Sequence, residues 1–152
     1  MRFLIAAVGR GGKGPEQALF AHYAARLRPP IDLREVEERR PLPTAERQAR
    51  EAEKLLAAVP LGARIVALDE RGKSLSSTDL AATLGAWRDQ GAPAAAFLIG
   101  GADGHDESVR QRADLTLALG TMTWPHLLVR GLIAEQIYRA QCILDGHPYH
   151  RA

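Results

Sequence analysis

Residues 3–15, FLIAAVGRGGKGP, contain the pattern that indicates the fold class. The first six of these residues are apolar and predict a buried strand. Four glycines follow within residues 9–14, and they predict a tight turn, because glycine adopts backbone angles that other residues avoid. Pro15 is typical of the first turn of a helix. Strand, turn and helix in this order indicate the first unit of an α/β fold.

The same order repeats along the rest of the chain. Further strands are predicted at residues 31–36, 64–68, 94–99 and 115–119. Helices are predicted at residues 15–27, 44–59, 77–89, 107–112 and 125–144. Thr44 is expected to cap the second helix and Ser77 or Thr78 the third, while Gly146 ends the last one. Strict alternation predicts an α/β fold in which helices cover both faces of a parallel sheet, a three-layer sandwich in one domain, residues 1–152.

The composition narrows the class of protein. The chain has 152 residues, of which 46% are hydrophobic, enough for a sizeable core. A single cysteine, Cys142, excludes an internal disulfide and indicates a buried thiol in a reducing compartment. Apolar runs such as residues 92–99 are too short to span a membrane, and the chain opens on a strand-like segment, so we expect a cytoplasmic protein without a membrane partner. A net charge of +2 permits an anionic partner without demanding one.

Ligands of parallel sheets bind beyond the carboxyl ends of the strands, and in this chain four loops follow those ends. The loops are residues 9–14, 70–76, 100–105 and 119–126. In the third loop, three glycines within five residues would let a ligand lie against bare backbone. The fourth loop frames backbone donors and acceptors with apolar surface and carries no fixed positive charge. It therefore suits an adenine and a thioether better than a phosphate.

The first loop also matches the dinucleotide-binding pattern G-x-G-x-x-G. The glycines would be Gly9, Gly11 and Gly14, and the acidic partner Glu37 or Glu38. A small Rossmann-like dinucleotide-binding protein is therefore one alternative. However, the proline after the turn removes an N–H donor that a pyrophosphate would use, and glycine-rich turns often have purely conformational causes. A chain of this length also leaves little room for a substrate domain.

The long terminal helix has more apolar surface than one sheet face requires. Contact with a second copy of the chain would explain this surface, and so would enclosure of the helix within its own domain. Glu135 and Arg139 are spaced for an ordinary helix ion pair. Arg130 has no such local partner, so a buried Arg130 needs an anion or other acceptors, for which a phosphate or a cofactor carboxylate would serve.

The C-terminal residues concentrate side chains that bind ligands. Residues 147–151, HPYHR, offer two imidazoles, a phenol and a guanidinium directly after the long helix. Tails usually end in small polar residues, so this one either contacts a ligand or packs as a terminal turn. Three isolated residues are expected on the surface or in packing: His22, Trp87 and His105.

Several motifs, in order along nearly the whole chain, match those of one family. They are Leu68-Asp69 with Gly72-Lys73, Leu98-Ile99-Gly100-Gly101 with Gly104, Thr123 with Pro125-His126, Val129-Arg130, Glu135-Gln136-Ile137-Tyr138-Arg139-Ala140, and His147-Pro148-Tyr149-His150-Arg151. On these residues the chain resembles the ribosomal RNA large subunit methyltransferase H family, a member of the SPOUT class. The resemblance implies an α/β-knot fold, in which the C-terminal segment is threaded into a trefoil knot, and it implies a homodimer.

The activity implied by this resemblance is transfer of a methyl group from S-adenosylmethionine to N3 of a pseudouridine. The target lies in 23S large-subunit ribosomal RNA, within the ribosome. The resemblance places the cofactor against eight residues: Leu68, Gly100, Leu119, Gly120, Thr121, Met122, Thr123 and Trp124. It implies no metal and no second cofactor, because a sulfonium supplies its own leaving group and the enzyme mainly aligns the reactants.

The N3 proton must leave in such a reaction, so a basic or charge-stabilising group is expected near the base. The catalytic candidates are His126, Arg139 and His150. The RNA-binding candidates are Arg130, Tyr149 and Arg151. Tyr149 could stack on a base and Arg151 could hold a phosphate, within the chain or across a dimer interface.

The chain also departs from the family pattern. Trp124 stands where a smaller apolar residue is common and Gly120 where a serine is usual, so the cofactor pocket is expected to be reshaped there. Residues 39–41 replace a longer lysine-rich loop, which bears on RNA docking. A non-catalytic RNA-binding module is the second alternative, and it would use Arg130, Arg139, Tyr149 and Arg151. It gives no reason for three loops of cofactor-binding type.

Overall fold

Five parallel strands form the sheet of this protein in a computed structural model that describes residues 1–151. The strands are β1 (Arg2–Val8), β2 (Asp32–Val36), β3 (Arg64–Ser74), β4 (Ala94–Ile99) and β5 (Leu115–Ala118). Their order across the sheet is β2-β1-β4-β3-β5, and each neighbouring pair is parallel. The carboxyl ends of all the strands therefore meet at one edge. Residue 152, the last of the predicted domain, lies outside the described residues.

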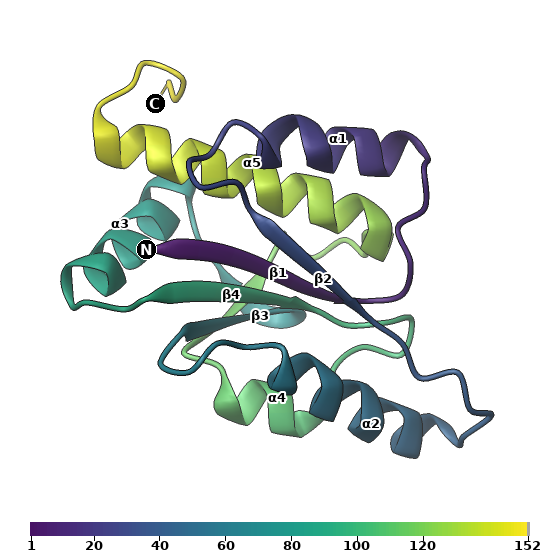
Figure 1. Cartoon of the computed structure of the whole chain (residues 1–152). Helices are drawn as coiled ribbons and strands as arrows, with labels where there is room; N and C mark the ends of the chain where they lie inside the picture. The colour runs from purple at the N-terminus through teal and green to yellow at the C-terminus, as the bar shows by residue number, and fades with distance from the viewer. Residues whose placement is uncertain (152) are drawn as a thin grey trace.

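Helices cover both faces of this sheet (Figure 1). They are α1 (Pro15–Ala24), α2 (Thr44–Ala57), α3 (Ser77–Asp89), α4 (Glu107–Arg112) and α5 (His126–Asp145). Along β1, Phe3 and Ile5 join the core beneath α1, α3 and α5, whereas Leu4 and Ala6 join the core beneath α2 and α4. Successive strand residues point to opposite faces, so a continuous apolar run fills both cores. The predicted three-layer sandwich is confirmed.

Helices α2 and α3 begin at Thr44 and Ser77, as predicted, but the residues predicted to cap them were wrong. Pro43, not Thr44, occupies the cap position of α2, and no side chain caps this helix. At α3 the cap is Ser76, whose hydroxyl accepts a hydrogen bond from the Asp79 N–H at 3.0 Å. Several adjacent hydroxyls compete for a cap in the sequence, and the backbone angle of Ser76 decides among them. The predicted stop at Gly146 is confirmed by its left-handed φ of 73°.

Strand β3 continues to Ser74, six residues beyond Leu68, where the apolar run and the predicted strand both end. Leu117 of β5 pairs with both Leu68 and Lys73, so the chain between these two residues bulges out of the ladder and then returns. Gly72 lies in this bulge and leaves no room for a side chain against the backbone of β5. A Cβ at Gly72 would lie 2.6 Å from the carbonyl carbon of Thr116. The polar composition of residues 69–74 hid the return to the sheet.

Helix α5 lies between α1 and α3 on one face of the sheet. Gly131 admits the side chain of Leu19, since a Cβ at Gly131 would lie 2.7 Å from Leu19 Cδ2. These intrachain contacts account for much of the apolar surface of α5, as expected of a helix enclosed within its own domain. That surface therefore gives less support to a homodimer, which stays a prediction. Cys142 on this helix is buried, as predicted. Among the described helices, none has the length and apolar character needed to cross a bilayer.

Candidate active site

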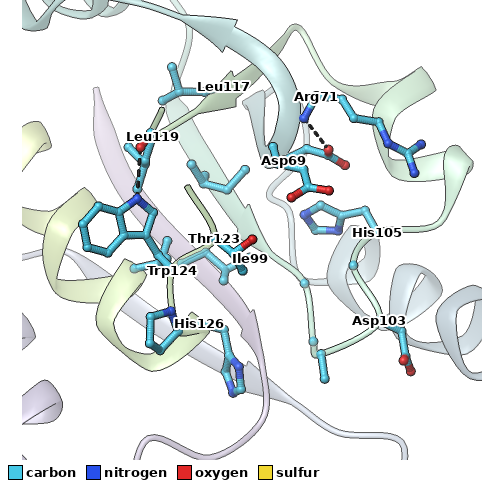
Figure 2. Close-up of a pocket in the computed structure, with 18 of the residues that line it drawn as sticks. Asp69, Arg71, Ile99, Asp103, His105, Leu117, Leu119, Thr123, Trp124 and His126 are labelled. Atoms are coloured by element: carbon cyan, nitrogen blue, oxygen red, sulfur yellow. Dashed lines mark hydrogen bonds between the residues drawn. The ribbon is translucent and has the colours of Figure 1, made fainter. Parts of the chain in front are cut away.

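A cavity of about 490 Å³ opens at the carboxyl ends of β4 and β5, beside the bulge of β3 (Figure 2). Its walls come from residues 68–71 at the bulge of β3, from the loops after β4 and β5, from the first turn of α5, and from single residues of α2 and α4. The lining residues are Gln48, Leu68, Asp69, Glu70, Arg71, Ile99, Gly100, Gly101, Ala102, Asp103, Gly104, His105, Arg110, Leu117, Leu119, Gly120, Met122, Thr123, Trp124, Pro125, His126 and Val129. The cavity is therefore where the parallel-sheet rule predicts a ligand.

Most residues predicted to hold the cofactor line this cavity. The set comprises Leu68, Gly100, Leu119, Gly120, Met122, Thr123 and Trp124. Thr121 belongs to the same loop but does not line the cavity. His126, predicted as catalytic, also lines it. Sequence reasoning missed Gln48 of α2 and Arg110 of α4, because neither lies in a loop and neither belongs to a motif.

The glycines after β4 form a turn too tight for larger residues. Gly101 and Gly104 make an isolated antiparallel bridge, and Gly104 has a φ of 78°. A Cβ at Gly100 would lie 3.1 Å from the carbonyl carbon of Gly104. The turn thus presents bare backbone to the cavity, as the spacing of its glycines predicted.

The end of the cavity beside α4 is polar. Arg110 donates a hydrogen bond to Asp69 Oδ2 at 3.0 Å. The Arg71 N–H donates to Asp69 Oδ1 at 2.9 Å (Figure 2). Burial alone would raise the pKa of Asp69, but these two bonds outweigh it and the pKa is lowered. Asp69 is therefore an anion that fixes the polar wall.

His105 forms part of this wall from a buried position, as the packing interpretation predicted. Its Nε2 lies 3.0 Å from the carbonyl oxygen of Leu98. Because a carbonyl can only accept, Nε2 carries the proton, and a neutral ring leaves Nδ1 as a bare acceptor. Nδ1 is buried and has no partner among residues 1–151. Burial lowers the pKa of His105 below its ordinary value of 6.5.

The buried neutral state of His105 predicts a loss of stability in mild acid. The unfolded chain takes up a proton near pH 6.5, whereas the folded chain resists it until the lower folded pKa is reached. The contribution of neutral His105 to the free energy of unfolding is greatest above pH 6.5 and decreases as the pH falls below this value. Urea unfolding at about pH 7.5 and about pH 5.5 should show a smaller decline for His105→Gln than for the wild type. Equal declines would contradict this assignment.

Glu51 of α2 is a buried carboxyl group behind the glycine turn. A Cβ at Gly101 would lie 3.4 Å from Glu51 Oε2, and no hydrogen bond or ion pair reaches Glu51 from the described part of the chain. Burial, and then the negative charge of Asp103, raise the pKa of Glu51. At neutral pH this residue therefore reduces stability.

Replacing Glu51 with glutamine should raise the free energy of unfolding at pH 7 by about 1 kcal/mol, because a buried charge disappears at constant shape. A raised folded pKa means that the folded state holds its proton more tightly, so the cost appears as pH rises above 4.5 through the folded pKa. The gain should therefore vanish near pH 4. Glu53→Gln is the matched control, because Glu53 is exposed on the same helix. A destabilised Glu51→Gln protein at pH 7 would refute the argument.

The C-terminal tail folds back onto α5 and joins Arg139 with His150. Arg139 Nη1 lies 3.1 Å from His150 Nδ1, and Arg139 Nη2 lies 2.5 Å from Glu135 Oε1, which confirms the predicted ion pair. The Tyr149 hydroxyl donates to Glu135 at 2.9 Å, and the Arg139 guanidinium lies 4.8 Å from the Tyr149 ring centre. Burial and the bond to Glu135 raise the pKa of Tyr149, so the phenol stays protonated. The tail is packed, as one of the two interpretations held.

The third catalytic candidate is distant from these two along the helix. His126 and Arg139 are 13 residues apart on α5, which is roughly 20 Å at 1.5 Å per residue. Arg139 lines a second cavity of about 470 Å³, which includes Glu135 and Gln136. Leu119, Gly120 and Trp124 line both cavities, so their loop separates the two.

Arg130 has an internal partner, which corrects its predicted contact with RNA. Its side chain is 2% exposed, with Nη1 2.5 Å from Glu35 Oε2 and Nη2 2.8 Å from the Gly9 carbonyl oxygen. A guanidinium enclosed in this way offers no surface to a phosphate. From the sequence we predicted an anionic partner for Arg130 and interpreted this partner as a ligand. The partner is instead the carboxylate of Glu35, 95 residues away in the chain.

The contacts of the Glu35 carboxylate also argue against the dinucleotide-binding alternative. Glu35 Oε2 accepts a hydrogen bond from the Gly11 N–H at 2.5 Å, so an internal anion already occupies a donor of the turn. Gly9 and Gly12 have φ values of 98° and 67°, which explains the glycines conformationally. Glu37 and Glu38 pair with arginines of their own loop. Within residues 1–151, no three His, Cys, Asp or Glu side chains gather into a metal site.

Comparisons with known proteins agree with this geometry. A family model described as "Predicted SPOUT methyltransferase" matches residues 1–150. The chain is 63% identical to ribosomal RNA large subunit methyltransferase H of Rhodospirillum rubrum over 152 residues, with 100% of both chains covered. It is 61% identical to the protein of the same name from Paramagnetospirillum magneticum, with 99% of both chains covered.

Among solved structures, the SpoU methyltransferase AviRb from Streptomyces viridochromogenes, in complex with AdoMet, superposes with a TM-score of 0.49 at 14% identity. The superposition covers 94% of this chain and 61% of that one. The family match confirms the predicted SPOUT, or α/β-knot, class of fold. The parallel sheet, the cavity at its carboxyl edge and the relatives that match along the full length lead to one conclusion: the chain belongs to the SPOUT methyltransferase family, and within it to the ribosomal RNA large subunit methyltransferase H group.

Proposed function

We propose that this protein methylates large-subunit ribosomal RNA with S-adenosylmethionine as the methyl donor. The observation that carries the proposal is the cavity at the carboxyl edge, formed where the bulge of β3 and the loops after β4 and β5 converge. Relatives that match the whole chain are named for the same activity. When bound, the cofactor would supply an electrophilic methyl group with its own leaving group.

The residues present fit such a cofactor. The turn from Gly100 to Gly104 offers bare backbone, and the loop from Leu119 to Trp124 offers backbone groups between apolar side chains. The cavity volume of about 490 Å³ is within the usual range for small-molecule sites. The chain's own contribution is to hold the donor, orient the acceptor and exclude water.

We assign N3 of a pseudouridine in 23S ribosomal RNA as the acceptor of the methyl group, and Arg139 as the group that stabilises charge on the base as the N3 proton passes to solvent water. Arg139 donates to His150 Nδ1, so a neutral His150 carries its proton on Nε2. His150 is then a donor, and the fixed cation beside it offsets the negative charge of the deprotonated base. Tyr149 anchors the tail through Glu135, and base stacking by Tyr149 is a further part of the proposal. Arg151 is exposed and is proposed to hold a phosphate.

The distance of roughly 20 Å between His126 and Arg139 along α5 supports a homodimer in which one chain supplies the cavity and the other the tail. Mixed dimers test this arrangement. One subunit would carry Gly100→Val, which fills the cavity turn, and the other Arg139→Ala. If sites form between chains, the mixed dimer keeps one intact site and regains activity. If each chain completes its own site, both sites are defective and activity stays absent.

The central experiment measures cofactor binding and methyl transfer separately. Thermal unfolding with S-adenosylmethionine, S-adenosylhomocysteine or NAD reports binding, because a ligand at about 100 times its Kd adds about 2.7 kcal/mol of stability. Transfer of a radiolabelled methyl group to ribosomes, large subunits and free 23S RNA identifies the substrate, and reverse-transcription stops locate the base. Stabilisation by NAD alone, or binding of the adenosyl ligands without any methylation of ribosomal RNA, would overturn the proposal.

A further inference from the structure

The loop between β5 and α5, residues 119–124, is held together by a side chain rather than by its backbone. Among the described residues, no backbone hydrogen bond joins two members of this loop. One bond does cross it: the Trp124 indole Nε1–H donates to the Leu119 carbonyl oxygen at 3.0 Å (Figure 2). The bond links the end of β5 to the residue before the cap of α5.

The position of Trp124 makes this bond informative. The indole is 42% exposed, which is unusual for so large an apolar side chain, and it lines both cavities on either side of the loop. Gly120, with a φ of 92°, allows the chain to turn directly after Leu119. Without this bond, a loop that has no backbone hydrogen bonds of its own would sample many conformations. The entropic cost of ordering the loop would then weaken the binding of any ligand that requires one of these conformations.

We infer that Trp124 is a positioning residue: its indole N–H fixes residues 119–124 in the shape that binds the adenosyl cofactor, before the cofactor arrives. This inference rests on the proposed function, because it concerns the same cavity. The bond persists in the complex, so Trp124 lowers the Kd of the cofactor while leaving the rate of methyl transfer at saturation almost unchanged. Trp124 acts through Leu119 and not on the reacting atoms.

Trp124→Phe tests the inference, because phenylalanine keeps an aromatic ring but has no N–H to donate. We expect the Kd of S-adenosylmethionine, measured by calorimetry, to rise about fivefold to tenfold, as loss of one hydrogen bond predicts. The kcat at saturating cofactor should stay within about twofold of the wild-type value. The midpoint of urea unfolding should equal that of the wild type within experimental error. Trp87→Phe is the matched control, since Trp87 is the other tryptophan and is buried in the core. It should reduce stability and leave the Kd unchanged.

The two indole N–H groups also give a direct spectroscopic readout. In a ¹H–¹⁵N spectrum, the Trp124 signal, identified by its loss in Trp124→Phe, should be protected from hydrogen exchange in the free protein and in the cofactor complex. Loss of protection on binding would show that the cofactor displaces the indole, and would overturn the inference. An unchanged Kd in Trp124→Phe would overturn it as well. Both results require that the wild type binds the cofactor; if the wild type does not bind, the proposed function fails first.

Discussion

Replacing Gly72 with alanine is expected to lower the free energy of unfolding by about 3 kcal/mol or more, at the upper end for an overpacked site. The new Cβ would lie 2.6 Å from both the carbonyl carbon and the oxygen of Thr116, and 2.7 Å from the carbonyl carbon of Leu117. These are backbone atoms in the middle of β5, so no side chain can rotate away. Either β3 or β5 must shift.

A shift of β5 would also be felt in the cavity, because the cofactor loop begins where β5 ends. We therefore expect weaker binding of S-adenosylmethionine together with reduced stability. Urea unfolding of the purified variant checks the first effect and calorimetry the second. Gly14→Ala is the control, since its Cβ would meet only the carboxylate end of Glu16, which is free to move. A Gly72→Ala protein as stable as the control would show that the β3 bulge is more adaptable than its contacts indicate.

Replacing Arg139 with alanine is expected to reduce kcat for methyl transfer about 100-fold or more, as removal of one preorganised charge-stabilising donor does in other enzymes. The Kd of S-adenosylmethionine should change less than twofold, because Arg139 lines the second cavity and not the first. Single-turnover methylation of ribosomes, with the cofactor saturating, measures the first quantity. Calorimetry measures the second.

A structural explanation must be separated from this catalytic one, because Arg139 also contacts Glu135 and Tyr149. Tyr149→Phe removes the hydroxyl that bonds Glu135 and keeps Arg139, so it loosens the tail without removing the charge. We expect Tyr149→Phe to retain most of its kcat. If both variants lose activity equally, ordering of the tail, and not the guanidinium charge, is what methyl transfer requires. Arg88→Ala, on the partly exposed side of α3, controls for a change of net charge.

The layers of this protein could be predicted from residue patterns because they depend on local periodicity. Apolar runs such as Ala94–Ile99 fill both faces of a buried strand, and the predicted limits match β4. The glycines from Gly100 to Gly104 likewise indicated a tight turn at the carboxyl edge, because Gly104 has a left-handed φ and a Cβ at Gly100 would lie only 3.1 Å from the carbonyl carbon of Gly104. Periodicity ended the prediction of β3 too early, since residues that return to a sheet through a bulge need not be apolar.

The candidate site likewise combines features that residue patterns predicted with features that they did not. Residue patterns alone placed the loops after β1, β4 and β5 at the carboxyl edge, because alternation of strands and helices predicts a parallel sheet, and the motifs predicted the family. The partners of single side chains became visible only in the folded chain: Arg130 with Glu35, His150 with Arg139, and the Trp124 indole with Leu119. The physical reason is the range of the interactions. Helix and strand patterns repeat over a few residues, whereas a buried charge or a bare acceptor is satisfied by whichever group the fold brings within about 3 Å.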